Sequence, residues 1–334
     1  MSVLPIEVAC DESGSEGEKL VGGNTDVFCH ASVRLTAAEA ADCVRELRAL
    51  IRSPAVEYKS GHLLREKNRH ALEWFLGPAG PVGGRANAYL VDKRWLLLLA
   101  LARRLLDTPP FADDADVAGL GAQGVASALY RASRATVRPG LWTRFLTVLN
   151  DLMRFGAAGD AVSTSDLVEL AEELRRIEPL AAVDGLLGVF DRHRAGLDAF
   201  LRTRRRPDPL LPLALDPLSP AILRAIEHWS ADGAPVSIVH DRHVTLTEAR
   251  MARIAEFHTV SGLGGRLSAI RLVTSGADPR VQVADYLAGV ARKLASDELL
   301  GTADPALTGL VRQHVDPRSI WGDAESRARV CRPV

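Results

Sequence analysis

Two acidic residues follow a short apolar segment near the N-terminus, in Ala9-Cys10-Asp11-Glu12-Ser13-Gly14. The alternation of apolar and polar residues before them predicts a β-strand whose last residue is Asp11. The end of a strand is a rigid place to hold a carboxylate, and a glycine turn beside it leaves room for a bulky ligand. Acidic turn residues are common and mostly solvated, so the segment gains meaning only from partners elsewhere in the chain.

Further acids occupy comparable positions. Asp241 ends the apolar segment 235–241, and Asp285 lies in a helix predicted over 281–294. The residues one turn from Asp285 are mostly small or apolar, so burial of that helix face requires its carboxylate to be paired, neutral or bound to a cation. The alternative is that Asp285 lies at the edge of this helix and pairs with Arg292 or Lys293.

Carboxylates gathered in this way repel one another unless cations separate them. Oxygen ligands suit Mg²⁺ or Mn²⁺, with water and substrate phosphate completing the coordination. Two such ions about 4 Å apart activate a water and stabilise the leaving oxygen of an in-line displacement at phosphorus. Glu57 and Asp92, near the ends of other strand-like segments, are additional candidates. The pattern therefore indicates hydrolysis of a phosphoester.

Basic and imidazole side chains lie near these acids in the sequence. Lys59 and Lys93 could steady a scissile phosphate or neutralise the acids, or serve as ordinary salt-bridge partners. His240 and His243 flank Asp241, and their spacing favours hydrogen-bonded structural histidines over metal ligands. The arginine cluster 202–206 is equally compatible with phosphate binding and with a solvated linker.

The predicted elements place strands at both ends of the chain. A strand over 27–33 can return antiparallel to the first, and Thr36 with Glu39 forms a capping box for the helix that follows. A second helix is expected over about 63–75. Thr245 with Glu248 suggests another capping box, and Asp278-Pro279 marks a helix start. Further strands are predicted over 88–93, 235–241 and 267–273.

Between these two strand regions the apolar spacing is almost purely helical, over 96–106, 124–135, 141–155, 165–177 and 221–229. One α/β core interrupted by a helical block follows from this order. The predicted division is a discontinuous core of 1–93 and 234–300, a helical insertion or cap of 94–233, and a C-terminal extension of 301–334.

Composition is that of a globular protein, with 334 residues, 47% hydrophobic residues and a net charge of -1. Strong non-specific attraction to nucleic acid cannot be argued from this balance. The longest apolar run, 95–102, is too short to cross a membrane, and no signal peptide is evident. The four cysteines show no paired metal spacing, which is typical of reduced thiols in a cytoplasmic protein.

The order of five segments resembles a known family: Asp11-Glu12-Ser13-Gly14, Glu57-Tyr58-Lys59, Val91-Asp92-Lys93, Val239-His240-Asp241 and Gln282-Val283-Ala284-Asp285. The chain looks like a member of the domain-of-unknown-function family numbered 3800, over its first 93 residues and residues 234–295. The resemblance implies an RNase H-like mixed sheet flanked by helices and a metal-dependent nuclease site. It carries over Asp11, Asp241 and Asp285 as metal ligands, with Glu12 and Glu57 less securely placed.

The sequence therefore leads to three hypotheses. The first is a metal-dependent nuclease that hydrolyses DNA or RNA by a two-metal mechanism, with Asp11, Asp241 and Asp285 holding Mg²⁺ or Mn²⁺. Glu12 or Glu57 would complete the shell or orient water, and Lys59 would assist. The second is a non-catalytic module whose helical insertion recruits protein or nucleic acid. The third is a small-molecule phosphohydrolase that uses the same acids under a helical lid.

Overall fold

The computed structural model describes residues 4–52, 59–105, 121–154, 162–177, 183–188, 190, 195, 197–198, 215–259 and 264–333. Within these residues the protein is mixed α/β, with one five-stranded sheet in the order β3-β2-β1-β4-β5. The strands are β1 (Ile6–Ser13), β2 (Val27–Val33), β3 (Ala86–Asp92), β4 (Val236–Asp241) and β5 (Leu267–Val273).

The sheet joins strands from the two ends of the chain. β1 pairs antiparallel with β2 and parallel with β4, so the N-terminal hairpin and the C-terminal strands share their central strand. β2 pairs antiparallel with β3, and β4 pairs parallel with β5. The predicted mixed α/β class, with strands from both ends of the chain in one sheet, is therefore confirmed. The C-terminal ends of β1, β4 and β5 meet at one edge of the sheet, where Asp11 and Asp241 lie.

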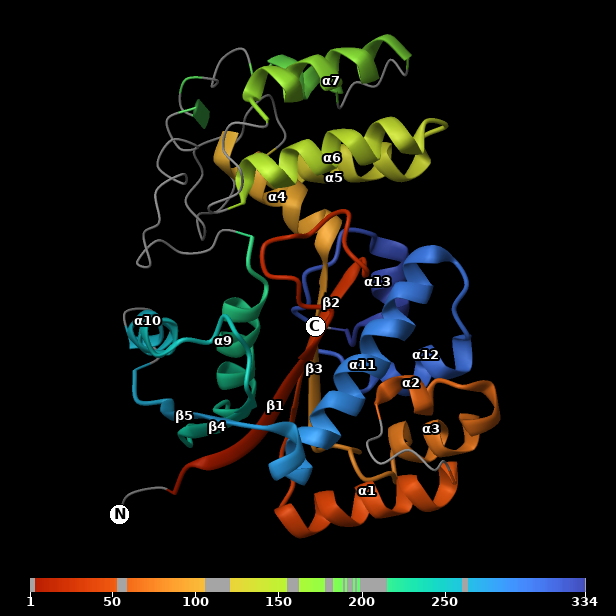
Figure 1. Cartoon of the computed structure of the whole chain (residues 1–334), viewed down its shortest axis with the longest axis vertical. Helices are drawn as coiled ribbons and strands as arrows, with labels where there is room; N and C mark the ends of the chain where they lie inside the picture. The colour runs from red at the N-terminus through yellow and green to blue at the C-terminus, as the bar shows by residue number, and fades with distance from the viewer. Residues whose placement is uncertain are drawn as a thin grey trace.

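Helices cover both faces of the sheet (Figure 1). One face carries α11 (Pro279–Leu300), which packs along β1 and β2 and is surrounded by other helices. Those are α1 (Ala37–Ile51), α2 (Ser60–Leu63), α3 (Arg69–Leu76), α12 (Pro305–Arg312) and α13 (Ala324–Val330). The other face carries α9 (Leu218–Trp229) and, farther from the sheet centre, α10 (Glu248–His258).

A separate hydrophobic core lies between the helices that follow β3, which stack beyond one end of the sheet (Figure 1). They are α4 (Lys93–Leu105), α5 (Ala122–Ala135), α6 (Pro139–Met153) and α7 (Thr164–Ile177). The predicted helical block also includes α9, but the apolar residues of α9, among them Leu218 and Ile222, pack against the sheet. None of the described helices is long and apolar enough to cross a membrane.

Several predicted helix boundaries agree with the structure. The capping box at Thr36 and Glu39 is present, with the Glu39 N–H donating to the Thr36 hydroxyl and the Thr36 N–H donating to the Glu39 carboxylate. Asp278 caps α11, as its position before Pro279 predicts. That helix runs beyond the predicted end at 294 and stops where Gly301 adopts a φ of 72°, a conformation that glycine accepts at little cost.

Two local predictions are wrong. The expected helix over 63–75 is broken into α2, a short 3₁₀ turn and α3, because the Asn68 side chain donates to the His62 carbonyl and replaces a helical hydrogen bond. The cap of α10 is Thr247, whose hydroxyl accepts from the Arg250 N–H, and not Thr245. The Thr245 hydroxyl is engaged with the His243 ring instead.

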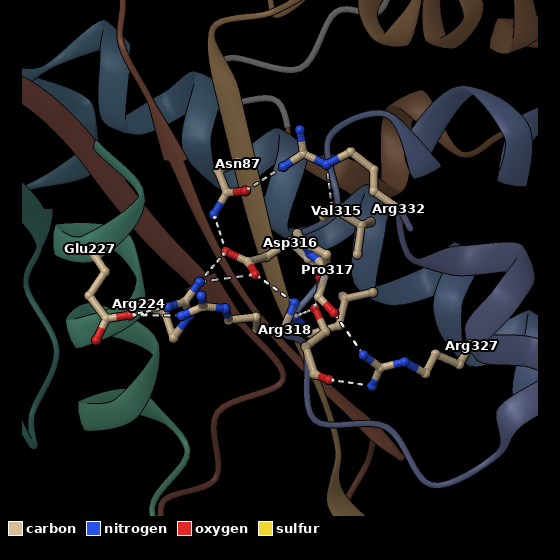
Figure 2. Close-up of polar contacts among 11 residues, drawn as sticks. Asn87, Arg224, Glu227, Val315, Asp316, Pro317, Arg318, Arg327 and Arg332 are labelled. Carbon is tan, nitrogen blue, oxygen red and sulfur yellow. Dashed lines mark hydrogen bonds and ion pairs between the residues drawn. The ribbon is translucent and has the colours of Figure 1, made fainter. Parts of the chain in front are cut away.

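A buried ionic network ties the C-terminal segment to the outer edge of β3 (Figure 2). The fully buried Asp316 accepts hydrogen bonds from Asn87 and from the Arg224 guanidinium, which lies on α9. Arg332 donates to the side-chain amide oxygen of Asn87, Oδ1, from the other side. The Ala88 N–H donates to His314, and the Asp316 N–H donates to Ala88, so the segment continues the hydrogen bonding of the sheet edge. These contacts cover an edge strand that would otherwise be exposed.

Candidate functional site

The alternation of side chains along a strand separates the two N-terminal acids. On β1, Ala9 belongs to the core beneath α11, whereas Cys10 belongs to the core on the α9 side. Asp11 therefore points toward α11, and Glu12 points to the opposite face. β1 continues to Ser13, so Asp11 is not the last strand residue that the sequence predicted. The two adjacent carboxylates therefore lie on different faces of the sheet.

Asp241 joins Asp11 on the α11 face. Val239, two residues earlier on β4, packs in the core beneath α11, and Cys10 of β1 is paired with His240 of β4. Asp241 thus lies beside Asp11 at the ends of two parallel strands. Asp285 approaches from α11, which packs along β1. Three of the predicted site residues therefore converge on one face at the end of the sheet.

The pKa of Asp11 is affected by the other acids, in agreement with this convergence. Asp11 is buried, and burial raises its pKa to about 9. The carboxylate of Glu12 adds to this rise, followed by those of Asp285 and Asp241. The hydrogen bond of 2.7 Å that Asp11 Oδ1 accepts from the Glu12 N–H acts in the opposite direction. Like charges close to a desolvated carboxyl favour its neutral form, or a bound cation.

Lys59 is the cation that the structure places beside these acids. Its Nζ lies 3.6 Å from Asp285 Oδ2. The pairing of Asp285 with Arg292 or Lys293, offered by the sequence, is not the one observed. Lys293 pairs with Asp297, one turn farther along α11, and Arg292 Nε donates to Ser13 Oγ at 3.0 Å. Asp285 is instead directed toward β1 and α2.

Glu12 faces a group of histidines on the other side of the sheet. His240 Nε2 lies 3.7 Å from Glu12 Oε2, and His243 Nε2 lies 3.6 Å from Glu12 Oε1. His30, opposite Glu12 in the register of β2, stacks on His240, and their Nε2 atoms are 3.2 Å apart. His30 and His240 are both buried. The predicted structural role of His240 and His243 agrees with these hydrogen-bonded positions.

The protonation of the two buried histidines follows from their contacts. His240 Nδ1 lies 2.8 Å from the Asp241 carbonyl oxygen, which can only accept, so His240 donates from Nδ1. Burial lowers the pKa of His240 to about 4, so the ring is neutral and its Nε2 accepts from His30. Neither ring then brings positive charge to Glu12. Burial, with the Asp241 carboxylate, raises the pKa of Glu12 to about 7.

The remaining predicted site residues either lie outside the described residues or have structural roles elsewhere in the fold. Glu57 and the arginine cluster 202–206 lie outside the described residues. Asp92 is buried and accepts hydrogen bonds from the Tyr130 hydroxyl and the Trp95 N–H, which makes it a structural residue of the β3–α4 junction. Lys93 is also buried, and its Nζ donates to Thr25 and pairs with Glu16 at 3.5 Å.

A metal ion would have to complete much of its coordination with other oxygens. Among the described residues, no three His, Cys, Asp or Glu side chains are arranged so as to hold an ion by themselves. Mg²⁺ commonly uses only one or two carboxylates, with water and substrate phosphate in the remaining positions. The buried Glu12 Oε2 has no hydrogen-bond partner among the described residues. The oxygen-rich donor set and the uncompensated negative charge both fit Mg²⁺ or Mn²⁺.

The helical block holds the loop that leaves the site. Asn150 of α6 is buried, and its side chain accepts from the Leu20 and Val21 N–H groups at 2.9 and 3.1 Å. It also donates to the Glu18 carbonyl at 2.8 Å. Leu20 lies in the core of the helical block. The segment that follows Asp11 and Glu12 is thus fixed between the sheet end and α6, so the block lies at the same end as the acids.

Sequence reasoning missed two residues that contact this region. His30 lies in an apolar run, and only the antiparallel register of β1 and β2 brings it opposite Glu12. The sequence predicts Arg292 only as a partner for Asp285, whereas it contacts Ser13.

Comparison of the chain with protein-family models, curated proteins and solved structures gives no match.

Proposed function

We propose that this protein is a metal-dependent phosphodiesterase that hydrolyses DNA or RNA. The observation that carries the proposal is the convergence of Asp11, Asp241 and Asp285 on one face of the sheet end, with Lys59 as the neighbouring cation. A protein gains no stability from gathering carboxylates around a buried one such as Asp11, so their placement favours a function that uses a cation.

The topology supports an RNase H-like assignment for the core. The mixed order β3-β2-β1-β4-β5, in which β2 alone runs antiparallel to the other strands, is consistent with the RNase H-like mixed sheet that the resemblance implies. The acids at the ends of the two central parallel strands and on the helix beside them are consistent with the implied site. We include membership of the domain-of-unknown-function family 3800 in the proposal, on the motifs quoted above.

In this proposal Asp11, Asp241 and Asp285 hold Mg²⁺ or Mn²⁺ through carboxylate oxygens. When bound, the ions would activate water and stabilise the oxygen that leaves phosphorus. Lys59 balances the charge of Asp285 while the substrate is absent. Glu12, whose pKa is raised by burial and by the carboxylates of Asp241 and Asp285, would complete the shell or orient water. The helical block, joined to the site loop by Asn150, limits which substrates enter.

The test combines metal binding with cleavage. Purified protein, Asp241→Asn and the control Asp297→Asn are titrated with Mn²⁺ in a calorimeter, and then incubated with labelled single- and double-stranded DNA and RNA. We expect wild type and Asp297→Asn to bind Mn²⁺ and cleave at least one substrate, with cleavage stopped by chelator. Asp241→Asn should lose at least 100-fold in rate and bind Mn²⁺ more weakly.

Two outcomes would contradict the proposal. Cleavage that persists in chelator, or that is equal in wild type and Asp241→Asn, would exclude a metal site at these acids. Hydrolysis of nucleotides without cleavage of any nucleic acid would replace the nuclease with a small-molecule phosphohydrolase. Mn²⁺ binding without hydrolysis of either class would indicate the non-catalytic module.

A further inference from the structure

We propose that Arg292, held by Ser13, binds the substrate phosphate next to the scissile one, so that the site takes a phosphodiester chain and not a mononucleotide. This inference rests on the proposed function and adds a substrate-binding position to it. It starts from the hydrogen bond to Ser13 that fixes the guanidinium beyond the acids, on the same face of the sheet.

Arg292 is placed on the site face by two independent periodicities. On α11, Asp285, Gly289 and Arg292 are separated by four and three residues, so they form one stripe along the helix. On β1, Asp11 and Ser13 are two residues apart and share a face. Arg292 Nε donates to Ser13 Oγ at 3.0 Å, which joins the end of the stripe to the end of the strand. The acids and the guanidinium therefore border the same surface.

Between the two ends of the stripe, α2 packs closely against α11. Gly289 lies midway along the stripe, and a Cβ added there would fall 2.0 Å from Ser60 Oγ and 3.8 Å from Ser13 Oγ. The hydroxyls of Ser13 and Ser60 thus approach the helix where it carries no side chain. Both can donate to an anionic oxygen, since a hydroxyl is both donor and acceptor.

The guanidinium has unused capacity for an anion. It carries five N–H donors, and its hydrogen bond within the described part of the chain is the one to Ser13. No carboxylate of the described residues lies within ion-pair distance of it. The nearby Lys93, by contrast, is already paired with Glu16 and bonded to Thr25. A half-buried arginine without an acidic partner is well suited to a phosphate, which its planar fork can bind through two hydrogen bonds.

The spacing favours a chain over a single phosphate. Asp11 and Ser13 are about 7 Å apart along β1, and Asp285 and Arg292 are about 10 Å apart along α11. A phosphate held by ions at the acids would leave the Arg292 guanidinium, which is anchored at Ser13, available for a second phosphate. A nucleic acid strand carries a charge on every nucleotide, so its next phosphate can reach Arg292.

The experiment compares substrates with one phosphate and with many. Wild type, Arg292→Gln, Arg292→Lys and the control Lys293→Gln are assayed with Mn²⁺ on bis(4-nitrophenyl) phosphate and on 20-nucleotide single-stranded DNA and RNA. Lys293 is a suitable control because it is the next residue on α11 and pairs with Asp297. Thermal melts verify that each variant is folded.

We expect Arg292→Gln to reduce kcat/KM on the oligonucleotide at least tenfold more than on the small ester, mainly through KM. Arg292→Lys should recover part of the loss, and Lys293→Gln should change either rate less than twofold. Equal losses on both substrates, or no loss on the oligonucleotide, would overturn the inference.

Binding gives a second measurement that does not depend on turnover. Fluorescence anisotropy of the labelled oligonucleotide is measured with Mn²⁺ in the Asp241→Asn background, with and without Arg292→Gln. The second substitution should weaken binding about tenfold at low salt and lower the slope of log affinity against log salt by just under one. If wild type hydrolyses nothing, the proposed function fails, whereas a loss of binding specific to Arg292 would still support the phosphate site. Unchanged affinity and salt slope would refute that site.

Discussion

Replacing Asp11 with asparagine should make the protein more stable, and increasingly so as pH rises. In chelator, the buried Asp11 carboxyl has no cation to balance the neighbouring carboxylates, and its pKa is raised to about 9 from the ordinary 3.8. A carboxyl group whose pKa is raised in the folded state makes its full contribution to stability only at pH values below its pKa in the unfolded chain. Its contribution is lost as pH rises from about 4 to about 9, because the unfolded chain ionises first.

The magnitude follows from the same two values. At pH 7.5 the unfolded chain ionises Asp11 while the folded protein keeps it protonated. This costs at most about 5 kcal/mol, the product of about 1.4 kcal/mol per pH unit and the gap between pH 7.5 and 3.8. Asparagine removes the titration, keeps the shape of the side chain and can still accept the hydrogen bond from the Glu12 N–H. A gain of about 2–4 kcal/mol is therefore expected at pH 7.5, and almost none at pH 4.

The assay is urea denaturation in chelator at pH 4, 6 and 7.5, followed by circular dichroism. Asp92→Asn is the comparison variant: burial also raises the pKa of Asp92, but its carboxylate accepts hydrogen bonds from Tyr130 and Trp95, which oppose that rise. Its replacement should destabilise the protein by about 1–3 kcal/mol. The reasoning is refuted if Asp11→Asn gives no gain at pH 7.5, or the same gain at pH 4. Glu12 keeps a smaller pH dependence of the same sign in both variants.

Two further substitutions test the structure around the site. Gly289→Ala should destabilise the protein by about 1–3 kcal/mol and reduce activity, because its Cβ would fall 2.0 Å from Ser60 Oγ; in thermal melts Gly309→Ala, where nothing lies nearby, should stabilise slightly. Asp316→Ala should cost about 1–3 kcal/mol in urea denaturation, because it leaves the buried Asn87 amide without its acceptor and leaves Arg224 with Glu227 as its remaining carboxylate partner. A cost below about 1 kcal/mol would show that the C-terminal network contributes little.

Much of the architecture could be predicted because its signals are local. The strand alternation over 27–33 and 267–273 and the caps at Thr36 and Asp278 depend on neighbouring residues alone, and each appears in the structure. The failures have a different origin. The break before α3 and the cap of α10 depend on side chains, Asn68 and His243, that compete for backbone or hydroxyl partners. No periodicity in the sequence reports that competition.

The same distinction between local and non-local signals applies to the residues of the candidate site. Asp11, Asp241 and Asp285 could be proposed together because each follows or faces an apolar element of the core. The roles of Glu12, His30 and Arg292 depend on strand register and on which face of β1 each side chain meets. A shift of one residue in that register would exchange Asp11 and Glu12 between the faces. Sequence alone could not distinguish these two arrangements.

The register also explains why two adjacent acids can have separate functions. Asp11 meets the acids of β4 and α11, where a cation is required to balance the charge. Glu12 meets neutral histidines, one of which donates to the Asp241 carbonyl and so links the two faces through the backbone of β4. The pair Asp11-Glu12 is best understood as a junction between a charged face and a neutral, hydrogen-bonded one.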